Sequence, residues 1–353
     1  MKKSLNKGSL EFAFLVFVIF GLLTVMTFVF FDIDIRTSIH DFFETMEEAE
    51  EEFHRIGVKY PILRHELVEP GKLGEDVGTG ISDCEDLKNI DTGGDYHLTR
   101  NIYCSEVEDF ESIGSTGSPF TGTFDGRGYE IGNLEGNFKG LFHKNKGEIR
   151  NIRLVNVSIS SDEILGGLVT INEGEIENSS IDGGIITGDD VENDKTGGLV
   201  GTNTESGVIK NSFVNAYVLG DWTGGLVMQN KGTVKNSYAR GRVFGHSKVG
   251  GLVGRNHENI DKTYASSVTI WGGEGDKNLG GLVGESFGGH ASVKNSFWNV
   301  GIAHISPEDY EGKDHNKYGA PRSDSLMEQK KTYTDTRDPT LDNAWDFEEI
   351  WFI

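Results

Sequence analysis

Acidic residues concentrate in two insertions of the sequence, and they are the side chains with the most recognisable chemistry. The first insertion has Asp182, Asp189, Asp190 and Asp194, and the second, GGEGDKN at 272–278, has Glu274 and Asp276. Clustered carboxylates act as acid, base or nucleophile in glycoside cleavage, and their oxygens are ligands that Ca²⁺ prefers. A solvated acidic loop has the same composition, so solvation, calcium binding and ligand binding all remain open. Because both insertions shortly precede a Gly-Gly-Leu motif, we predict that they project on one side of the fold and mark a binding face.

The remaining reactive side chains form no recognisable catalytic pattern. His143, His246, His257 and His290 do not recur at matched positions, and neither a Ser-His-Asp arrangement nor an HExxH motif is visible. We therefore predict a protein that is not an enzyme and that needs no cofactor, with Ca²⁺ as the one candidate ion. A polysaccharide lyase or hydrolase that uses the acidic insertions is the alternative.

Two cysteines and two sequons point to modification outside the cytoplasm. Cys84 and Cys104 do not form a CxxC pair, which argues against a zinc site; they form either one disulfide in an oxidising compartment or two separate buried thiols. Asn156-Val157-Ser158 and Asn178-Ser179-Ser180 match the glycosylation sequon. Whether either asparagine is modified depends on whether its side chain points outward.

The composition limits the partners. The formal net charge of the 353 residues is −23, and a field of that sign repels nucleic acid and anionic lipid. We therefore predict no nucleic-acid partner, and we expect an extracellular glycan or protein as ligand. Hydrophobic residues make up 36% of the chain, which is enough for a sizeable core.

An uncharged run near the N-terminus predicts a membrane anchor. Residues 12–31 have no charged side chain and, as a helix, reach roughly 30 Å, the thickness of a bilayer core. Lysines precede the run and aspartates follow it, so we predict a single-pass protein with a cytoplasmic N-terminus and an extracellular C-terminal domain. Apolar residues then recur in steps of four and three up to Ile56, which extends the prediction to one long helix, apolar first and amphipathic afterwards.

The residues just before the anchor resemble a known leader. NKGSLEFAFLVF at 6–17 is similar to the class III signal of archaeal type IV pilin-like proteins. Lys7-Gly8 matches the cleavage position of that family, and Glu11 matches the acid at the head of its apolar helix. The spacing departs from the family, because Glu11 would be third in the mature chain where the family has it fifth. The resemblance implies processing and filament assembly with itself or other surface proteins; an uncleaved signal anchor is the alternative.

Two motifs recur together along the rest of the chain. The leucines of the Gly-Leu pairs are Leu141, Leu168, Leu199, Leu226, Leu252 and Leu282, spaced 27, 31, 27, 26 and 30 residues apart. A second signature, such as IKNSFVNAYV at 209–218, comes ten to thirteen residues after each leucine. Each copy alternates apolar and polar residues, which is typical of strands and not of helices. A period of this length predicts a parallel β-solenoid with three short strands and three corners in each coil.

The repeat assigns a role to each recurring residue type. The glycines would turn tight corners, where they tolerate positive φ and leave room for the main chain of the next coil, and the leucines would fill the core. Asparagines would stack at a second corner and hydrogen-bond along the ladder, where Lys262 interrupts them. The members of this column are Asn151, Asn178, Asn211, Asn236 and Asn295. An aromatic column of Phe213, Tyr238, Tyr264 and Phe297 would stack just inside it.

These repeats resemble the GLUG motif of bacterial and archaeal cell-surface proteins. CEDLKNIDTGGDYHLTRNIYC at 84–104 and the terminal NAWDFEEIWFI are similar to the opening and closing segments of such solenoids. The resemblance implies a mainly β fold, a right-handed parallel β-helix of about eight turns, in an adhesin-like surface protein. CEDLKNI would cap one end as a short helix, and Trp345, Phe347, Ile350, Trp351 and Phe352 would cap the other.

These parts together predict the organisation and the function of the chain. The predicted regions are a leader (1–8), a transmembrane and stalk helix (9–57), a linker (58–80), a β-solenoid (81–305) and a C-terminal loop and cap (306–353). We predict a membrane-anchored or pilin-like surface protein that presents a rigid solenoid for adhesion or for binding a glycan or protein. A tethered glycan-active enzyme and a purely structural component of a filament or wall are the alternatives.

Overall fold

A computed structural model describes residues 60–74, 76–105, 110–189, 194–271, 278–303, 305 and 314–352. The predicted leader, membrane anchor and stalk helix therefore lie outside the described residues. Within the described ranges, every helix is too short or too polar to span a bilayer. Tyr60–Ile353 form one compact unit.

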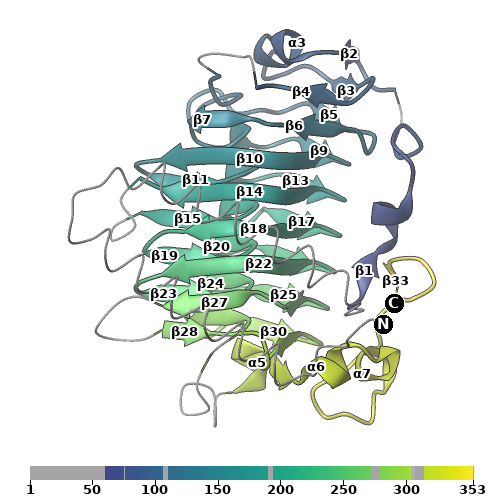
Figure 1. Cartoon of the computed structure of the whole chain (residues 1–353), viewed down its shortest axis with the longest axis vertical. Helices are drawn as coiled ribbons and strands as arrows, with labels where there is room; N and C mark the ends of the chain where they lie inside the picture. The colour runs from purple at the N-terminus through teal and green to yellow at the C-terminus, as the bar shows by residue number, and fades with distance from the viewer. Residues whose placement is uncertain are drawn as a thin grey trace, which may run out of the picture. The chain divides into compact units, whose positions relative to one another are not determined.

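The unit is a parallel β-solenoid of about seven turns, against the eight predicted (Figure 1). A complete coil contributes one strand to each of four stacked sheets, named B to E here, in the chain order D, B, C, E. The prediction of three strands per coil was therefore wrong. The fourth strand, in sheet E, is only three residues long and ends at the first glycine of the Gly-Gly-Leu motif.

Two of the stacked sheets, B and C, contain most of the strands. Sheet B contains β2 (Thr79–Ile81), β3 (Tyr96–Leu98), β5 (Thr123–Asp125), β9 (Glu148–Arg150), β13 (Glu175–Glu177), β17 (Val208–Lys210), β21 (Thr233–Lys235), β25 (Asn259–Asp261) and β30 (Ser292–Lys294). Sheet C contains β4 (Ile102–Tyr103), β6 (Glu130–Gly132), β7 (Glu135–Asn137), β10 (Arg153–Ser161), β14 (Ser180–Gly188), β18 (Phe213–Leu219), β22 (Tyr238–Gly245), β26 (Tyr264–Ala265), β27 (Val268–Trp271), β31 (Phe297–Asn299) and β32 (Ala320–Arg322).

The other two solenoid sheets are narrower. Sheet D contains β8 (Phe142–Asn145), β12 (Val169–Asn172), β16 (Val200–Asn203), β20 (Val227–Asn230), β24 (Val253–Asn256) and β29 (Val283–Ser286). Sheet E contains β11 (Ile164–Gly166), β15 (Lys195–Gly197), β19 (Trp222–Gly224), β23 (Lys248–Gly250) and β28 (Asn278–Gly280). Sheet A is a separate antiparallel pair, β1 (Ile62–Leu63) with β33 (Trp351–Phe352). The short helices are η1 (Arg64–Leu67), α3 (Cys84–Lys88), α5 (His315–Tyr318), α6 (Asp324–Met327) and α7 (Lys330–Thr334).

The leucine column is confirmed. All six leucines are fully buried, and the main-chain N–H of Leu168 donates to the carbonyl of Leu199, as Leu199 does to Leu226 and Leu226 to Leu252. Each leucine therefore lies directly above its equivalent in the next coil. The interior that they share runs through the whole solenoid as one hydrophobic cluster.

The glycine pairs allow the main chains of neighbouring coils to approach closely, as predicted. They do not adopt positive φ, so this part of their expected role is corrected. None of the glycines in the Gly-Gly-Leu motifs has φ in the left-handed region. Instead, a Cβ on Gly197 would collide with the carbonyl oxygen of Val200, and it would lie 2.6 Å from the main-chain nitrogen of Met228 in the next coil. Glycine is required here because the main chains of adjacent coils and adjacent sheets meet without room for a side chain.

Positive φ occurs instead at the corner between sheets B and C. The five stacked asparagines and Lys262 have φ between 47° and 55° there, a region that asparagine tolerates better than most residues. The predicted amide ladder forms only in part. Asn178 donates to Asn151 and Asn236 to Asn211, each over 3.2 Å, whereas Asn211 and Asn295 donate to the carboxylates of Glu177 and Asp261.

A second and more regular asparagine ladder lies inside the solenoid at the end of sheet D. Its members are Asn145, Asn172, Asn203, Asn230 and Asn256, all fully buried. Each amide donates to the amide oxygen of the next member over 2.8 to 2.9 Å. The ladder satisfies buried polar groups at a corner of the core, so it stabilises the wall that sheet D forms.

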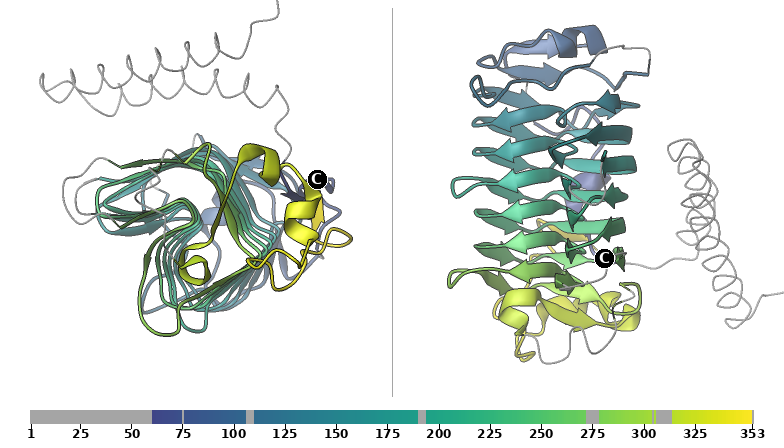
Figure 2. Two further views of the ribbon diagram at one scale, coloured as in Figure 1. Left: turned by 90° about the horizontal axis from the view of Figure 1, so that it is seen from below. Right: turned by 90° about the vertical axis from the view of Figure 1, so that its left-hand side faces the viewer.

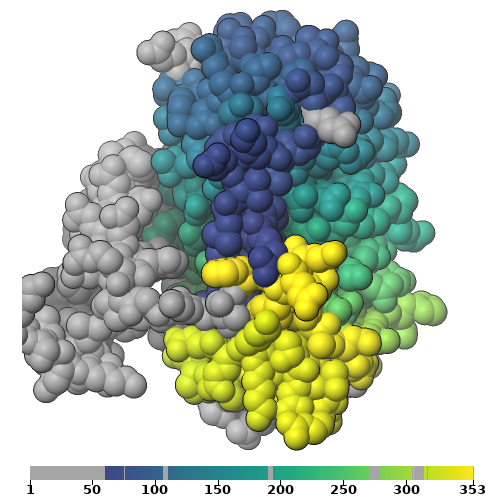
Figure 3. Space-filling view, turned by 90° about the vertical axis from the view of Figure 1, so that its right-hand side faces the viewer, coloured from purple at the N-terminus to yellow at the C-terminus, as the bar shows by residue number. Residues whose placement is uncertain are grey.

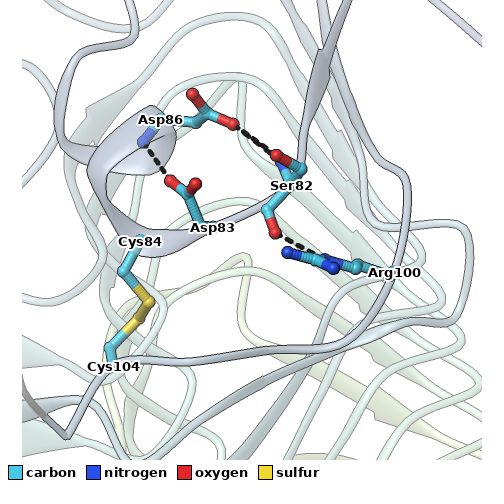
Figure 4. Close-up of a disulfide and its surroundings, with 6 residues drawn as sticks. All are labelled: Ser82, Asp83, Cys84, Asp86, Arg100 and Cys104. Carbon is cyan, nitrogen blue, oxygen red and sulfur yellow. Dashed lines mark hydrogen bonds between the residues drawn. A yellow bond between two sulfur atoms is a disulfide. The ribbon is translucent and has the colours of Figure 1, made fainter.

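The first coils are closed by helix α3, which fits the predicted cap. Leu87 of α3 is fully buried in the core cluster, and a disulfide joins Cys84 to Cys104 (Figure 4). The carboxylate of Asp83 accepts the N–H of Asp86 at the start of the helix over 2.9 Å. At the other end of the solenoid, α5 lies against β29 and β30.

The aromatic column faces outward from sheet C, which corrects the predicted inward position. The rings of Phe213, Tyr238 and Tyr264 stack with centroids 4.8 to 4.9 Å apart, whereas the next residue in each strand points into the core. The column belongs to a second cluster with Trp345 and Trp351. The C-terminal aromatic residues therefore do not cap the end of the solenoid as predicted; they cover one side of it.

The segment of residues 60–67, which we call the strap, covers the same side. Figure 3 shows the strap in purple, lying in a hollow of this face and meeting the yellow C-terminal segment. β1 of the strap pairs with β33, and Leu63 is fully buried. The hydroxyl of Tyr238 donates to Glu66 over 2.9 Å, and that of Tyr264 donates to the carbonyl of Pro61 over 2.6 Å. The strap and residues 345–352 together form a clamp over sheet C.

Candidate ligand-binding groove between sheets D and E

Sheets E and D meet at an inward bend that runs along the solenoid. The outline of the coils turns inward between them when the molecule is viewed along its axis (Figure 2). The bend is sharp because the glycine motif joins the two sheets, and a Cβ on Gly224 would lie 2.6 Å from the main-chain nitrogen of Gly254 in the next coil. Side chains that point outward from both sheets therefore face one another across the bend.

Two columns of outward-pointing residues line the bend. The column of sheet E is Ile164, Lys195, Trp222, Lys248 and Asn278, and that of sheet D is Lys144, Ile171, Thr202, Gln229, Arg255 and Glu285. Long charged side chains on an outer face are usually well exposed. Here the side chains of Lys248 and Arg255 are each 17% exposed and that of Lys144 is 13% exposed, because they pack against neighbouring side chains at the bend. We call this surface the D/E groove.

Trp222 lies at the centre of the groove, surrounded by cations. The Nζ atoms of Lys248 and Lys195, one coil to either side, lie 3.5 Å and 4.9 Å from the centre of the Trp222 ring. The guanidinium carbon of Arg255 lies 5.7 Å from the same ring centre. Cations over an indole face are held by the ring quadrupole, so the aromatic residue and the three charges form one cluster.

The cluster continues toward the C-terminal coils. Arg255 packs over the ring of Phe287 at 4.0 Å, and Phe287 is half exposed. Glu285 lies 2.6 Å from Arg255 and 3.6 Å from Lys248, so one carboxylate serves two cations. His257 contacts Gln229 over 3.2 Å, and burial together with the charge of Arg255 lowers the pKa of its imidazole from 6.5.

The groove carries an excess of positive charge in a strongly acidic protein. Its cations are Lys144, Lys195, Lys248 and Arg255, and its carboxylates are Glu173, which pairs with Lys144 over 2.6 Å, and Glu285. Among these described side chains the four cations outnumber the two carboxylates, whereas the whole chain carries a net charge of −23. A concave surface with exposed aromatic edges and surplus cations is suited to an extended ligand with apolar faces and negative charges.

The structure describes three of the six acidic residues predicted as a binding or calcium loop. Asp182 lies on the outer face of sheet C and accepts the amide of Asn215 over 2.8 Å. Asp189 accepts the amide of Asn137 over 2.6 Å, and Asp194 is buried next to β15. Asp190, Glu274 and Asp276 lie outside the described residues. In the described part of the chain, His, Cys, Asp and Glu side chains form no group of three that could hold a metal.

Both acidic insertions occupy the same kind of connection in the solenoid. The first joins β14 to β15 and the second joins β27 to β28, so both connect sheet C to sheet E. The cluster around Trp222 lies on the strands between them. The residues that line the groove are not the predicted acids, and the binding face predicted from the insertions stays a prediction.

The two sequons differ in their surroundings. Asn156 is exposed, with φ of 52°, in the middle of sheet C. Asn178 is half-buried and uses its amide in the corner ladder, and Ser180 of its sequon is 2% exposed. Lys7, Gly8 and Glu11 of the leader lie outside the described residues.

Sequence reasoning missed the groove, although a signal was present. Aligning the repeats on Gly-Gly-Leu places Ile164, Lys195, Trp222, Lys248 and Asn278 in one column, two positions before the glycine pair. That alignment shows the lysines on both sides of Trp222. It does not show that the column of sheet D faces them, because this depends on the bend between the sheets.

Comparisons with known proteins identify relatives of parts of the chain. No protein-family model matches it. A stretch of 130 residues is 33% identical to the "Putative Gly-rich membrane protein" of Evansella cellulosilytica and makes up 35% of this chain and 13% of that protein. A stretch of 97 residues is 40% identical to "Halomucin" of Haloquadratum walsbyi and makes up 26% of this chain and 1% of that protein. The matches thus span a small part of these relatives.

A solved structure shares the fold. The "putative immunoglobulin A1 protease" of Bacteroides ovatus superposes with a TM-score of 0.57 at 22% identity, over 72% of this chain and 89% of that one. This finding contradicts the prediction that the chain is not an enzyme, because a protein with the same solenoid is named for a protease. At this identity the likeness establishes the shared fold, and the protease activity stays with the neighbour.

Proposed function

We propose that this chain displays its solenoid outside the cell and binds an extended ligand, a glycan or a protein segment, in the D/E groove. The observation that carries the proposal is the recessed cluster of Trp222, Lys195, Lys248 and Arg255 on an otherwise acidic protein. Ligand sites combine concavity, aromatic side chains and a few placed polar groups, and the groove has all three.

The display outside the cell rests on the N-terminal sequence. Residues 12–31 would anchor the chain in the membrane with the solenoid outside, and a relative named as a membrane protein supports this placement. The leader would be cut after Gly8, with Glu11 guiding assembly as in pilin-like proteins, and the coils would be GLUG repeats. Mass spectrometry of the mature N-terminus tests the leader: a chain beginning at Met1 or Lys2 would contradict it.

Binding is tested on an array of glycans and peptides with the full-length chain in mild detergent. We expect retention of a subset of extended glycans, with affinity reduced tenfold or more by Trp222→Ala. Phe244→Ala is the matched control, because Phe244 is a half-buried aromatic residue on the outer face of sheet C. Equal losses in both variants, or no retention by the wild type, would refute the proposal.

The same samples distinguish attachment from catalysis. Because a protein of this fold is named for a protease, each retained ligand is incubated with the chain and analysed for cleavage products. Cleavage that Trp222→Ala abolishes would make the groove a substrate site, and retention without products would make it an attachment site. Electron microscopy of the cell envelope shows whether the chain enters filaments.

A further inference from the structure

We infer that the ligand of the D/E groove is an anionic polysaccharide with widely spaced negative charges. The inference rests on the proposed function and names the chemical class of its ligand. It depends on three features of the groove: cations not neutralised by the protein, the spacing of these cations, and the aromatic ring between them.

The cations of the groove have fewer carboxylate partners than positive charges. Among the described residues Lys195 makes no ion pair, and Lys248 and Arg255 share the single carboxylate of Glu285. Recessed cations are partly desolvated, so an anionic group that completes their pairing gains more there than on an open surface. The net charge of the whole chain is −23, so a polyanion needs a local group of cations such as this one in order to bind.

The spacing of the cations fits a polymer of low charge density. Lys195 and Lys248 lie one coil to either side of Trp222, and coils in register are about 4.8 Å apart, so the two lysine positions are about 10 Å apart. Duplex DNA presents a charge about every 1.7 Å along its axis, and the net charge of −23 would repel it. A glycan with carboxylate or sulfate groups separated by neutral rings matches the lysines and is repelled less, because it carries fewer negative charges per unit length.

Trp222 supplies the surface for the neutral part of the ligand. The lysines now lie over its ring at 3.5 Å and 4.9 Å, and their flexible four-carbon stems can turn each ammonium group from the ring toward an incoming anion. The freed indole face then packs against the C–H face of a sugar ring. Gln229 and Thr202, in the facing column of sheet D, provide hydrogen-bonding groups for hydroxyls.

The test compares a sparsely charged polysaccharide with its uncharged ester and with duplex DNA. Hyaluronate, which carries one carboxylate on every second sugar ring, its fully methyl-esterified form and duplex DNA are titrated into the full-length chain by calorimetry at 50 mM and 300 mM NaCl. We expect hyaluronate to bind at least tenfold more tightly than the ester, and to weaken at the higher salt concentration, because released counterions drive part of the binding. Lys195→Gln with Lys248→Gln should remove the preference for the charged polymer.

The variants separate this inference from the proposed function. Lys235→Gln with Lys294→Gln, on the outer face of sheet B, is the matched control and should keep the preference. Equal binding of the ester and the acid, lost in Trp222→Ala, would overturn the anionic class and leave the groove as a glycan site. Tighter binding of DNA would overturn the polysaccharide. No binding of any polymer, together with an empty array, would refute both proposals.

Discussion

The same coils present two outer faces that differ in almost every respect. The face of sheet C carries an aromatic column that is sealed by the strap and by residues 345–352, and Tyr238 and Tyr264 have no exposed surface. The D/E groove carries Trp222 with three cations around its ring, and Trp222 keeps part of its surface exposed. On both faces the coils are in register, so equivalent residues of successive coils lie above one another. The two faces differ in whether the chain supplies a cover, and we infer that the covered face stabilises the fold while the open face is left for a ligand.

The largest expected effect is the loss of a tryptophan from the clamp. Trp351 is fully buried and packs against Trp345, Tyr264 and Tyr238 with ring centroids 4.4, 6.1 and 6.4 Å away. Trp351→Ala should lower the free energy of unfolding by about 4 kcal/mol, since a buried tryptophan leaves a large cavity. Urea denaturation followed by circular dichroism measures the change.

Trp222→Ala is the matched substitution on the open face. It should cost about 1 kcal/mol or less, because the ring is partly solvated and mainly loses contacts with lysines. Ligand affinity should show the opposite order, falling with Trp222→Ala and not with Trp351→Ala under native conditions. Similar stability losses in the two variants would remove the distinction between a stabilising face and a binding face.

A somewhat smaller effect is expected from the asparagine ladder behind the groove. Asn203 accepts the amide of Asn172 and donates to Asn230, each over 2.9 Å, inside the wall that sheet D forms. Asn203→Ala should destabilise the fold by about 3 kcal/mol, because three buried hydrogen bonds are lost, the third to the carbonyl of Gly207, and polar groups are left with fewer partners. Thermal unfolding of the variant measures it.

The control for the ladder is an asparagine on the other face. Asn215 makes one exposed bond to Asp182 over 2.8 Å, so Asn215→Ala should cost about 0.5 kcal/mol. Both variants should keep the ligand affinity of the wild type below their melting temperatures. An affinity loss with Asn203→Ala would show that the interior of sheet D shapes the groove as well as supporting it.

The core of the solenoid could be predicted from the sequence because each coil repeats it. Leu168, Leu199 and Leu226 recur with the glycine pair, and any register that buries one buries all. The outward aromatic column could not be predicted, since Phe213 and Val214 are both apolar and alternation alone does not say which one faces the core. The pairing of β1 with β33 joins segments almost 290 residues apart and leaves no local signal.

The candidate site was harder to predict for a different reason. Carboxylates were predicted as the site because their chemistry is well known. Asp182 and Asp189 each accept an amide hydrogen instead, and the described residues form no group of His, Cys, Asp and Glu that could hold a metal. The cluster around Trp222 combines residues of two sheets. This cluster can be recognised only when the bend between sheets E and D is known. The glycine motif produces the bend, but the sequence of the motif does not show the direction in which the chain turns.

A pH effect of intermediate size should act mainly on the covered face. Burial, with Arg153 as a second cause, lowers the pKa of His65 in the strap from 6.5 to about 3. The folded state therefore holds His65 neutral, and its contribution is present above pH 6.5 and is lost progressively as the pH falls toward 3. By pH 5 the loss should be about 2 kcal/mol. Urea denaturation at pH 7 and pH 5 measures it.

Other groups make smaller contributions in this window. Burial also lowers the pKa of His143 and His257, which adds to the acid sensitivity, whereas burial raises the pKa of Glu66, which opposes it. His65→Leu should therefore lose most of the difference between pH 7 and pH 5. An unchanged difference in this variant would place the acid-sensitive contact outside the clamp.

The smallest effect is expected from calcium. The sequence predicted a calcium loop from acids that include Asp182 and Asp189, but both carboxylates accept amide hydrogens, which a metal would have to displace. An extracellular site with a dissociation constant of about 1 mM would stabilise the fold by about 1.4 kcal/mol at 10 mM Ca²⁺. We expect less than this value, measured by thermal unfolding with Mg²⁺ as the control for ionic strength. A larger stabilisation that Asp189→Asn abolishes would make the edge of the groove a metal site, and ligand binding there would then depend on calcium as well as on the lysines.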